Sequence, residues 1–228
     1  MRRTAALALL LLAACGGDAT PERAGTVTTS APATPGAPVA TAARLRSALL
    51  AVKDLPTGWS LVRDDDEDVD SFARGCGPLA ALDEAFAGGA DGAEARFGQQ
   101  DELGPFVTES LASLPSAADV TARIAALRTA LSRCPSFRYE DAGIAREVRV
   151  SAVPFPRLGD ETLASRVTTE FEIWRLSMTV LVVRIRNHTL LLVGSTVTAL
   201  NGRGPRLAPA DLERIARAAV TKAGRGLP

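Results

Sequence analysis

Three segments near the C-terminal end of the chain constrain its fold most strongly. Apolar and polar residues alternate over residues 166–173, and they alternate again over residues 179–186. Alternation with a period of two is typical of β-strands that have one buried face. Residues 189–196 contain an unbroken apolar run at 190–193, which favours a strand in the middle of a sheet, covered on both faces. Together, the three segments predict an antiparallel sheet.

The two alternating segments also predict a register, because a slip of one residue would turn a buried face toward solvent. Matching their apolar faces predicts three cross-strand pairs: Phe171 with Leu181, Thr169 with Val183, and Val167 with Ile185. A tight turn at Asn187 and His188 is then expected to lead into the third strand.

The other face of this predicted hairpin carries mixed charge beside apolar side chains. Its charged residues and their apolar neighbours are Glu170, Glu172, Arg184, Arg186, Val180 and Val182. We take the four charged residues as candidate ligand-binding residues, because mixed charge beside apolar surface can form a binding face. The alternative is that this face is only solvated or is covered by a helix.

Helices and further strands complete the predicted fold. The helices are expected at residues 41–55, 78–86, 116–134 and 209–224, and the strands at residues 93–97, 105–114 and 147–153. The third helix is the clearest, because Ser116 and Asp119 resemble a capping box at its start. This order predicts the α+β class, with a single domain in which an antiparallel β-sheet has helices packed mainly on one face.

The first forty residues are predicted to lie outside this domain. Two arginines and the apolar run at residues 5–12 form an export signal that is too short to span a bilayer. The sequence Leu12-Ala13-Ala14-Cys15 resembles the bacterial lipobox, which implies a lipid on the sulfur of Cys15. The alternative is an ordinary secretory signal. We expect a signal peptide over residues 1–14, a flexible Thr/Ala/Pro-rich tether over residues 15–40, and the folded domain over residues 41–228.

This organisation predicts a protein anchored by lipid to the extracytoplasmic face of the cell membrane. In that oxidising compartment the two remaining cysteines, Cys76 and Cys134, are expected to form a disulfide. The competing interpretation is a nucleophilic thiol with His188 as its base. It is less favoured, because two lone cysteines outside the cytoplasm form a disulfide more often than either acts as a catalytic nucleophile.

Charge and composition argue against several classes of function. The formal net charge is zero for the whole sequence and about minus two without the signal peptide, and no basic patch for nucleic acid is visible. The acidic stretch at residues 64–70 does not match a calcium loop, because Val69 and Gly75 occupy the positions of the turn glycine and the bidentate glutamate. With a single histidine and no Gly-x-Ser-x-Gly motif, we expect no metal, no cofactor and no enzyme activity.

A series of short motifs resembles a known family in its order. After the lipoprotein signal come DLPTGW at residues 54–59, the pair Cys76 and Cys134, LGDE at residues 158–161, and VVRIRN at residues 182–187. Over residues 41–224 this order is similar to the extracellular sensor domain of PknH-type serine/threonine kinases and to its stand-alone actinobacterial lipoprotein relatives. Those kinase domains typically carry two disulfides, whereas this chain can form one.

The resemblance implies binding at the cell envelope without catalysis. Sensor domains of this type are thought to bind a ligand in a cleft between sheet and helices. The partners we expect are the membrane, through the N-terminal lipid, and an unknown small molecule, a cell-wall component or an envelope protein. The alternative function is a carrier of lipid or glycolipid, which would require a large apolar cavity.

Overall fold

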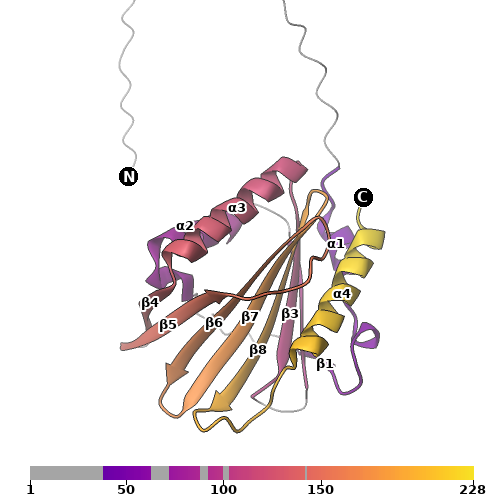
Figure 1. The fold of residues 1–228 in the computed structure, drawn as a ribbon. Coiled ribbons are helices and arrows are strands. Elements are labelled where there is room, and N and C mark those ends of the chain that lie inside the picture. Colours follow the sequence, from indigo (N-terminus) through magenta and orange to yellow (C-terminus); the bar gives the residue numbers. More distant parts are fainter. Residues whose placement is uncertain (1–37, 63–71, 88–91, 100–102, 142) are drawn as a thin grey trace, which may run out of the picture. The chain divides into compact units, whose positions relative to one another are not determined.

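The antiparallel sheet expected from the alternating segments is present and has eight strands (Figure 1). The computed structural model describes residues 38–62, 72–87, 92–99, 103–141 and 143–228. The chain divides into two units, residues 1–35 and residues 36–228, and only the second is described here. The signal peptide, Cys15, most of the predicted tether and the acidic stretch at residues 64–70 lie outside the described residues.

The strands follow the order β1-β2-β3-β8-β7-β6-β5-β4 across the sheet. They are β1 (Ser60–Val62), β2 (Gly92–Gly98), β3 (Phe106–Ser113), β4 (Ser136–Asp141), β5 (Ile144–Ala152), β6 (Glu161–Phe171), β7 (Trp174–Ile185) and β8 (His188–Ala199). The apolar run at residues 190–193 lies in β8, between β3 and β7. The predicted central strand is therefore confirmed.

The helices divide between the two faces of the sheet. They are α1 (Ala42–Ala48), α2 (Gly77–Ala87), α3 (Ala117–Arg133) and α4 (Pro209–Gly226), with short 3-10 turns η1 (Val52–Asp54) and η2 (Phe72–Gly75). Figure 1 shows α2 and α3 over one face, and α1 and α4 over the other. The α+β class, the antiparallel sheet and the single domain are confirmed, but the helices are not mainly on one face.

Each face has its own apolar cluster, because successive strand residues point to opposite sides. Under α1 and α4 lies the larger one, whose fully buried members include Phe97, Leu181, Leu190, Leu192 and Ile215. Under α3 lies a smaller one, formed by Leu114, Val120, Ile124 and Val182. Both faces of the sheet therefore carry apolar side chains that must be shielded from solvent. The helices α1 and α4 cover one face, and α2 and α3 cover the other.

Local signals correctly predicted where α1 and α3 begin. Thr41 is the N-cap of α1, and its hydroxyl accepts a hydrogen bond from the backbone N–H of Arg44 at 3.3 Å. Ser116 is the N-cap of α3, and its hydroxyl accepts from the N–H of Asp119 at 3.2 Å. A polar N-cap of this kind satisfies a backbone donor that has no partner in the first helical turn. The first helix ends at Leu49, earlier than the predicted stop at Pro56.

The predicted register of the β6–β7 hairpin is wrong. The structure pairs Phe171 with Trp174, Thr169 with Leu176, and Val167 with Met178. The strands turn at Glu172 and Ile173, so residues 174–178, which preceded the second predicted strand, are the beginning of β7. This shift also changes which residues share a face, because Val167 now lies beside Met178 rather than beside Ile185.

Two smaller corrections concern neighbouring segments. The turn into β8 is formed by Arg186 and Asn187, so His188 begins the strand instead of lying in the turn. The strand β4 was not predicted at all, because its polar sequence, Ser136–Asp141, shows little apolar alternation.

Candidate ligand-binding site

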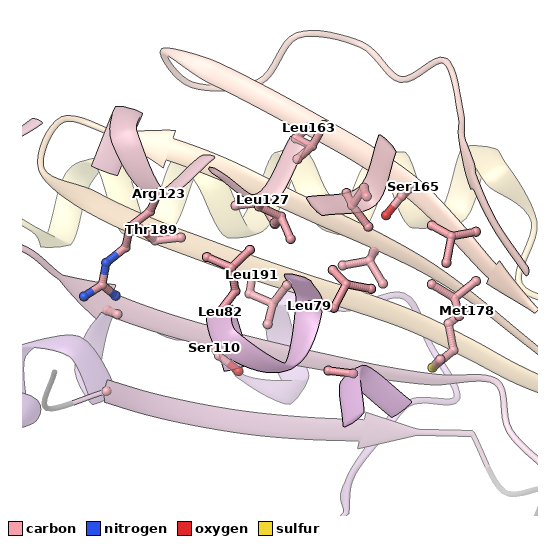
Figure 2. A pocket seen from close by; sticks show the side chains of 18 of the residues that line it. Leu79, Leu82, Ser110, Arg123, Leu127, Leu163, Ser165, Met178, Thr189 and Leu191 are labelled. Carbon is pink, nitrogen blue, oxygen red and sulfur yellow. The ribbon is translucent and has the colours of Figure 1, made fainter. Parts of the chain in front are cut away.

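A pocket of about 670 Å³ lies between the sheet and the helices α2 and α3. Ligand pockets in proteins typically have volumes of about 300–1,000 Å³. Its lining is mostly aliphatic, and Figure 2 shows these side chains converging from the sheet and the helices. The sheet contributes Leu163, Val167, Met178, Val180, Val182 and Leu191, and the helices contribute Leu79, Leu82, Leu127 and Leu131.

The alternation of the strands explains why these residues meet. In β7, Met178, Val180 and Val182 point to the pocket, whereas Leu181 and Val183 belong to the core on the other face. In β8, Leu191 points to the pocket and its neighbours Leu190 and Leu192 point away. Central strands that are apolar on both faces thus supply a core on one side and a pocket wall on the other.

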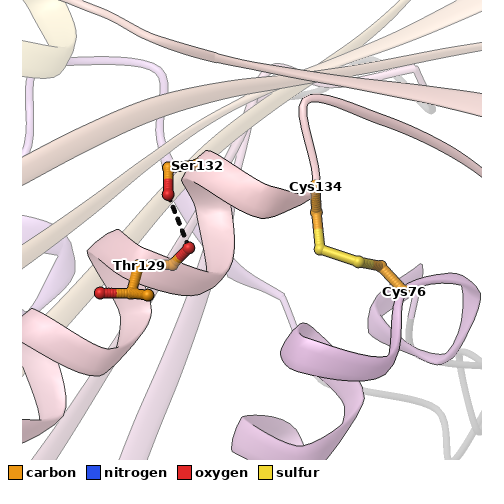
Figure 3. The surroundings of a disulfide bond; sticks show 4 residues. All are labelled: Cys76, Thr129, Ser132 and Cys134. Carbon is orange, nitrogen blue, oxygen red and sulfur yellow. Dashed lines mark hydrogen bonds between the residues drawn. A yellow bond between two sulfur atoms is a disulfide. The ribbon is translucent and has the colours of Figure 1, made fainter.

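The helices above the pocket are joined by the predicted disulfide. Cys76, just before α2, is bonded to Cys134, the C-cap of α3 (Figure 3). This confirms the expected pairing, and it excludes the competing interpretation of a free thiol nucleophile on either residue. The bond therefore joins the start of α2 to the end of α3.

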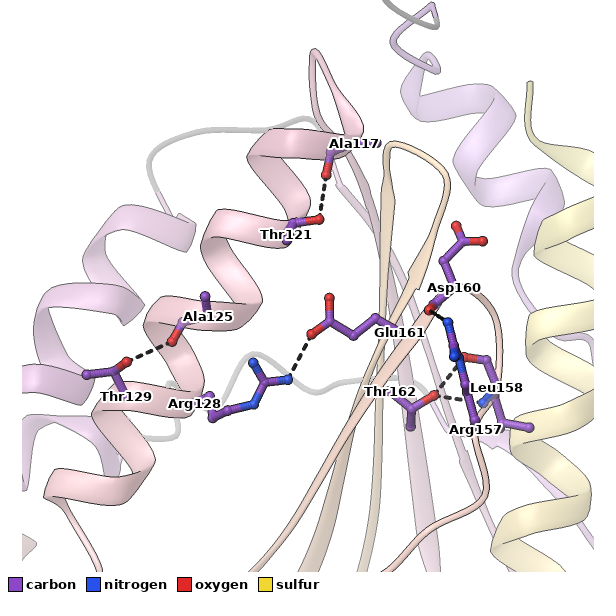
Figure 4. Close-up of polar contacts among 10 residues, drawn as sticks. All are labelled: Ala117, Thr121, Ala125, Arg128, Thr129, Arg157, Leu158, Asp160, Glu161 and Thr162. Atoms are coloured by element: carbon purple, nitrogen blue, oxygen red, sulfur yellow. Dashed lines mark hydrogen bonds and ion pairs between the residues drawn. The ribbon is translucent and has the colours of Figure 1, made fainter.

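A salt bridge attaches α3 to the sheet near its middle. Arg128 Nη2 lies 2.8 Å from Glu161 Oε1 at the start of β6 (Figure 4). The arginine side chain is about half exposed, so we expect the pair to add less than about 1 kcal/mol to stability. Its role is to help orient the helix over the pocket.

Two polar side chains lie at one end of the pocket, whereas Ser165 lies toward the other end (Figure 2). Arg123 from α3 and Thr189 from β8 lie at the same end of the lining in Figure 2, and Met178 lies at the other. Thr189 is 8% exposed, and its Oγ1 has no hydrogen-bond partner among the described residues. Ser110 donates a hydrogen bond to the carboxylate of Glu94 at the rim.

The opposite face of the sheet holds two buried ionisable groups that do not line this pocket. Glu109 in β3 is fully buried, and its Oε2 accepts a hydrogen bond of 2.6 Å from the backbone N–H of Leu50. Burial raises the pKa of Glu109 to about 7. His188 is also fully buried, its Nε2 lies 3.2 Å from the carbonyl oxygen of Pro228, and burial lowers its pKa.

The four charged residues predicted from the sequence do not form one cluster. Glu170 pairs with Arg175, and Glu172 lies in the turn with a φ of 51°. Arg184 and Arg186 lie at the other end of the hairpin. The pair that contains Arg184 is nine positions from the pair that contains Glu170, which is about 30 Å along a strand. Only Arg184 lies near the polar end of the pocket, because it is paired with Thr189.

Arg186 has a structural role instead. Its guanidinium donates hydrogen bonds to the carbonyl oxygens of Leu227 at 3.0 Å and Gly224 at 2.6 Å. These carbonyls belong to the C-terminal end of α4, where a cation is favoured.

The pocket was not predicted from the sequence, although the sequence contains part of the pattern that forms it. Leu127 and Leu131 are one helical turn apart, and both faces of β7 are apolar. Predicting the pocket would also have required the register of the β6–β7 hairpin and the division of the helices between the two faces of the sheet.

Comparison with known proteins shows similarity in fold. No family model and no curated protein matches the sequence. Among solved structures, the crystal structure of the extracellular domain of PknH from Mycobacterium tuberculosis is similar, with a TM-score of 0.58 and 13% identity. The match covers 83% of this chain and 100% of that chain. The fold is therefore PknH-like, as the motif resemblance implied. Within the described ranges, no helix is long and apolar enough to cross a membrane.

Proposed function

We propose that this protein is an extracytoplasmic, non-catalytic binding domain that holds a small apolar ligand in the pocket between the sheet and α2 and α3. The observation that carries the proposal is the pocket itself, with a volume of about 670 Å³ and an aliphatic lining. The similarity to the extracellular domain of PknH supports a position outside the cytoplasm and a sensor-like role.

A lipid or glycolipid carrier is the second candidate function. It is favoured by the character of the lining, which is built mainly from leucine, valine and methionine. Flexible aliphatic side chains suit an acyl chain, whereas flat aromatic ligands are usually held by aromatic stacking. Native mass spectrometry of protein purified from its own host distinguishes the two by identifying any retained compound.

Blocking the pocket is expected to abolish binding. Leu127 lies half-buried in α3 and lines the pocket, so Leu127→Trp would fill part of its volume. The ligand that co-purifies with the wild-type protein, seen as a mass excess that disappears on denaturation, should be absent from this variant. The matched control is Ala125→Trp, which places the same side chain at an exposed position of the same helix.

Two outcomes would contradict the proposal. If Leu127→Trp retains the compound in the same amount as the control, the ligand does not occupy the pocket. If wild-type protein carries no compound and binds none from a host lipid and metabolite extract, the pocket does not serve binding.

We further propose that a lipid on Cys15 anchors the domain to the outer face of the cell membrane, with residues 15–40 as the tether. The lipobox-like sequence before Cys15 supports this arrangement. In cells, the wild-type protein should partition into the detergent phase, and Cys15→Ala should shift it to the aqueous phase or leave an uncleaved precursor. A wild-type protein found in the aqueous phase would contradict anchoring by lipid.

A further inference from the structure

We infer that the ligand is a single-chain amphiphile with an anionic head, a carboxylate or a phosphate, which lies at the end of the pocket marked by Arg123 and Thr189. The inference rests on the proposed function, since it assumes that the pocket binds a ligand. Its tail would run along the aliphatic lining toward Met178 (Figure 2).

The hydroxyl of Thr189 is the first argument for a polar head at this end. The residue is 8% exposed, it lines the pocket, and its Oγ1 has no hydrogen-bond partner in the described part of the chain. Leaving a buried hydroxyl unpaired is costly, and most such groups in proteins have partners. A ligand acceptor at this position would satisfy it.

The charges around Thr189 favour a negative head over a neutral or positive one. Arg123 lines the pocket at this end. Arg184 is directly opposite Thr189 in the β7–β8 register, and its Nε is buried without a partner among the described residues. Directly opposite residues have Cβ atoms about 5 Å apart, so both side chains share the pocket face.

Two acidic groups nearby, Glu161 and Asp160, have cationic partners, and a third, Glu94, accepts a hydrogen bond from Ser110. Glu161, the residue opposite Arg184 in β6, is bonded to Arg128 at 2.8 Å. Asp160 lies 3.6 Å from the Nη1 of Arg184. Arg123 and the hydroxyl of Thr189 therefore line this end of the pocket, with Arg184 beside them in an ion pair with Asp160. Guanidinium groups bind carboxylates and phosphates in a paired geometry.

The rest of the pocket lining favours an aliphatic tail on the ligand. Between Arg123 and Leu131, α3 runs about 12 Å along the pocket, and its lining residues Leu127 and Leu131 are aliphatic. The facing strand residues Val180 and Val182 are aliphatic as well. Each methylene buried there would tighten binding about fourfold, which corresponds to about 0.8 kcal/mol.

The test uses the full chain carrying Cys15→Ala, oxidised so that the Cys76–Cys134 bond is formed. Dissociation constants are measured by calorimetry for dodecanoate, dodecyl phosphate, dodecanol and dodecyltrimethylammonium. We expect the two anionic compounds to bind at least tenfold more tightly than the other two. The comparison of dodecanoate with dodecyl phosphate separates a carboxylate head from a phosphate head. From octanoate to dodecanoate, affinity should rise about fourfold per methylene.

Two variants locate the head. Arg123→Gln should weaken dodecanoate about tenfold or more and leave dodecanol unchanged, because only the anion uses the guanidinium. Thr189→Val should weaken dodecanoate about fivefold without lowering the melting temperature, since it removes an unpaired hydroxyl. Arg133→Gln is the matched control, because it removes one positive charge from the same helix at an exposed residue that does not line the pocket.

The inference is overturned if dodecanoate and dodecanol bind equally, or if Arg133→Gln weakens dodecanoate as much as Arg123→Gln. It is also overturned if no amphiphile binds while a compound of another class co-purifies and is lost in Leu127→Trp. In that last case the pocket still binds a ligand, so the proposed function is supported. If the compound is retained in Leu127→Trp, both the proposed function and the anionic amphiphile are contradicted.

Discussion

Replacing both Cys76 and Cys134 with serine is expected to lower the free energy of unfolding by about 4 kcal/mol. The bond joins residues 58 positions apart, and in the chain-entropy description a closed loop of this length removes about that much conformational freedom from the unfolded chain. For a domain of this size the loss corresponds to a drop of roughly 8–16 °C in melting temperature. Thermal and urea unfolding of the double variant would measure it.

The variant should also loosen the pocket, because the bond joins the two helices that cover it. Reducing agent should bring the wild-type melting temperature down to that of the double variant and leave the variant unchanged. Ser132→Ala serves as a nearby control, since Ser132 is exposed and its hydroxyl only donates to the carbonyl of Thr129 at 2.7 Å (Figure 3). A loss below about 1 kcal/mol in the double variant would show that packing alone holds α2 and α3 in place.

Features set by neighbouring residues were predictable from the sequence. The cap at Ser116 and the start of α4 at Pro209 both follow from local patterns, and both are present. The disulfide was predictable because only two cysteines remain after Cys15. Each of these inferences needs only a few residues and a known compartment.

The hairpin register was not predictable, for two physical reasons. Both faces of β7 are apolar, with Leu181 and Val183 on one side and Val180 and Val182 on the other, so matching apolar faces had more than one solution. The turn also lacks its usual glycine or asparagine: Glu172 adopts a φ of 51°, a left-handed conformation that glutamate rarely takes.

The four candidate binding residues lie apart from one another for the same reason. They were chosen on the predicted hairpin face, and the correct register places Glu170 and Arg186 at opposite ends of the strands. The pocket depends on contacts between α3 and β8, which are about sixty residues apart in the chain. No local pattern records such a contact, so the structure was needed to find it.

Replacing Glu109 with glutamine is expected to make the protein more stable than the wild type at pH 8, by about 3 kcal/mol, and to leave it nearly unchanged at pH 4. Burial raises the pKa of Glu109 from its usual value near 4.5 to about 7. Below pH 4.5 this carboxyl is protonated in both the folded and the unfolded chain. Between pH 4.5 and 7 the unfolded chain releases the proton and the folded chain keeps it, so the wild type loses stability as the pH rises.

Above about pH 7 the loss is complete, because the carboxylate is then charged in both states. A difference of about 2.5 in pKa corresponds to about 3 kcal/mol. The charged groups near Glu109 are Lys222 from α4, which lowers its pKa, and Asp54 from η1, which raises it. These two groups form a salt bridge of 2.6 Å with each other, so their effects on Glu109 largely cancel and burial dominates.

Glutamine suits this test because it imitates the protonated carboxyl. Its amide oxygen can still accept the hydrogen bond from the N–H of Leu50, the contact that ties the end of α1 to β3. Urea unfolding of both proteins from pH 4 to pH 8 would measure the difference in free energy, with Glu140→Gln, exposed on the edge strand β4, as the control for the change in charge. Parallel curves for wild type and Glu109→Gln would mean that the buried carboxyl is not protonated in the folded state. A diverging pair would establish that ionisation of this one buried residue lowers the free energy of unfolding at neutral pH.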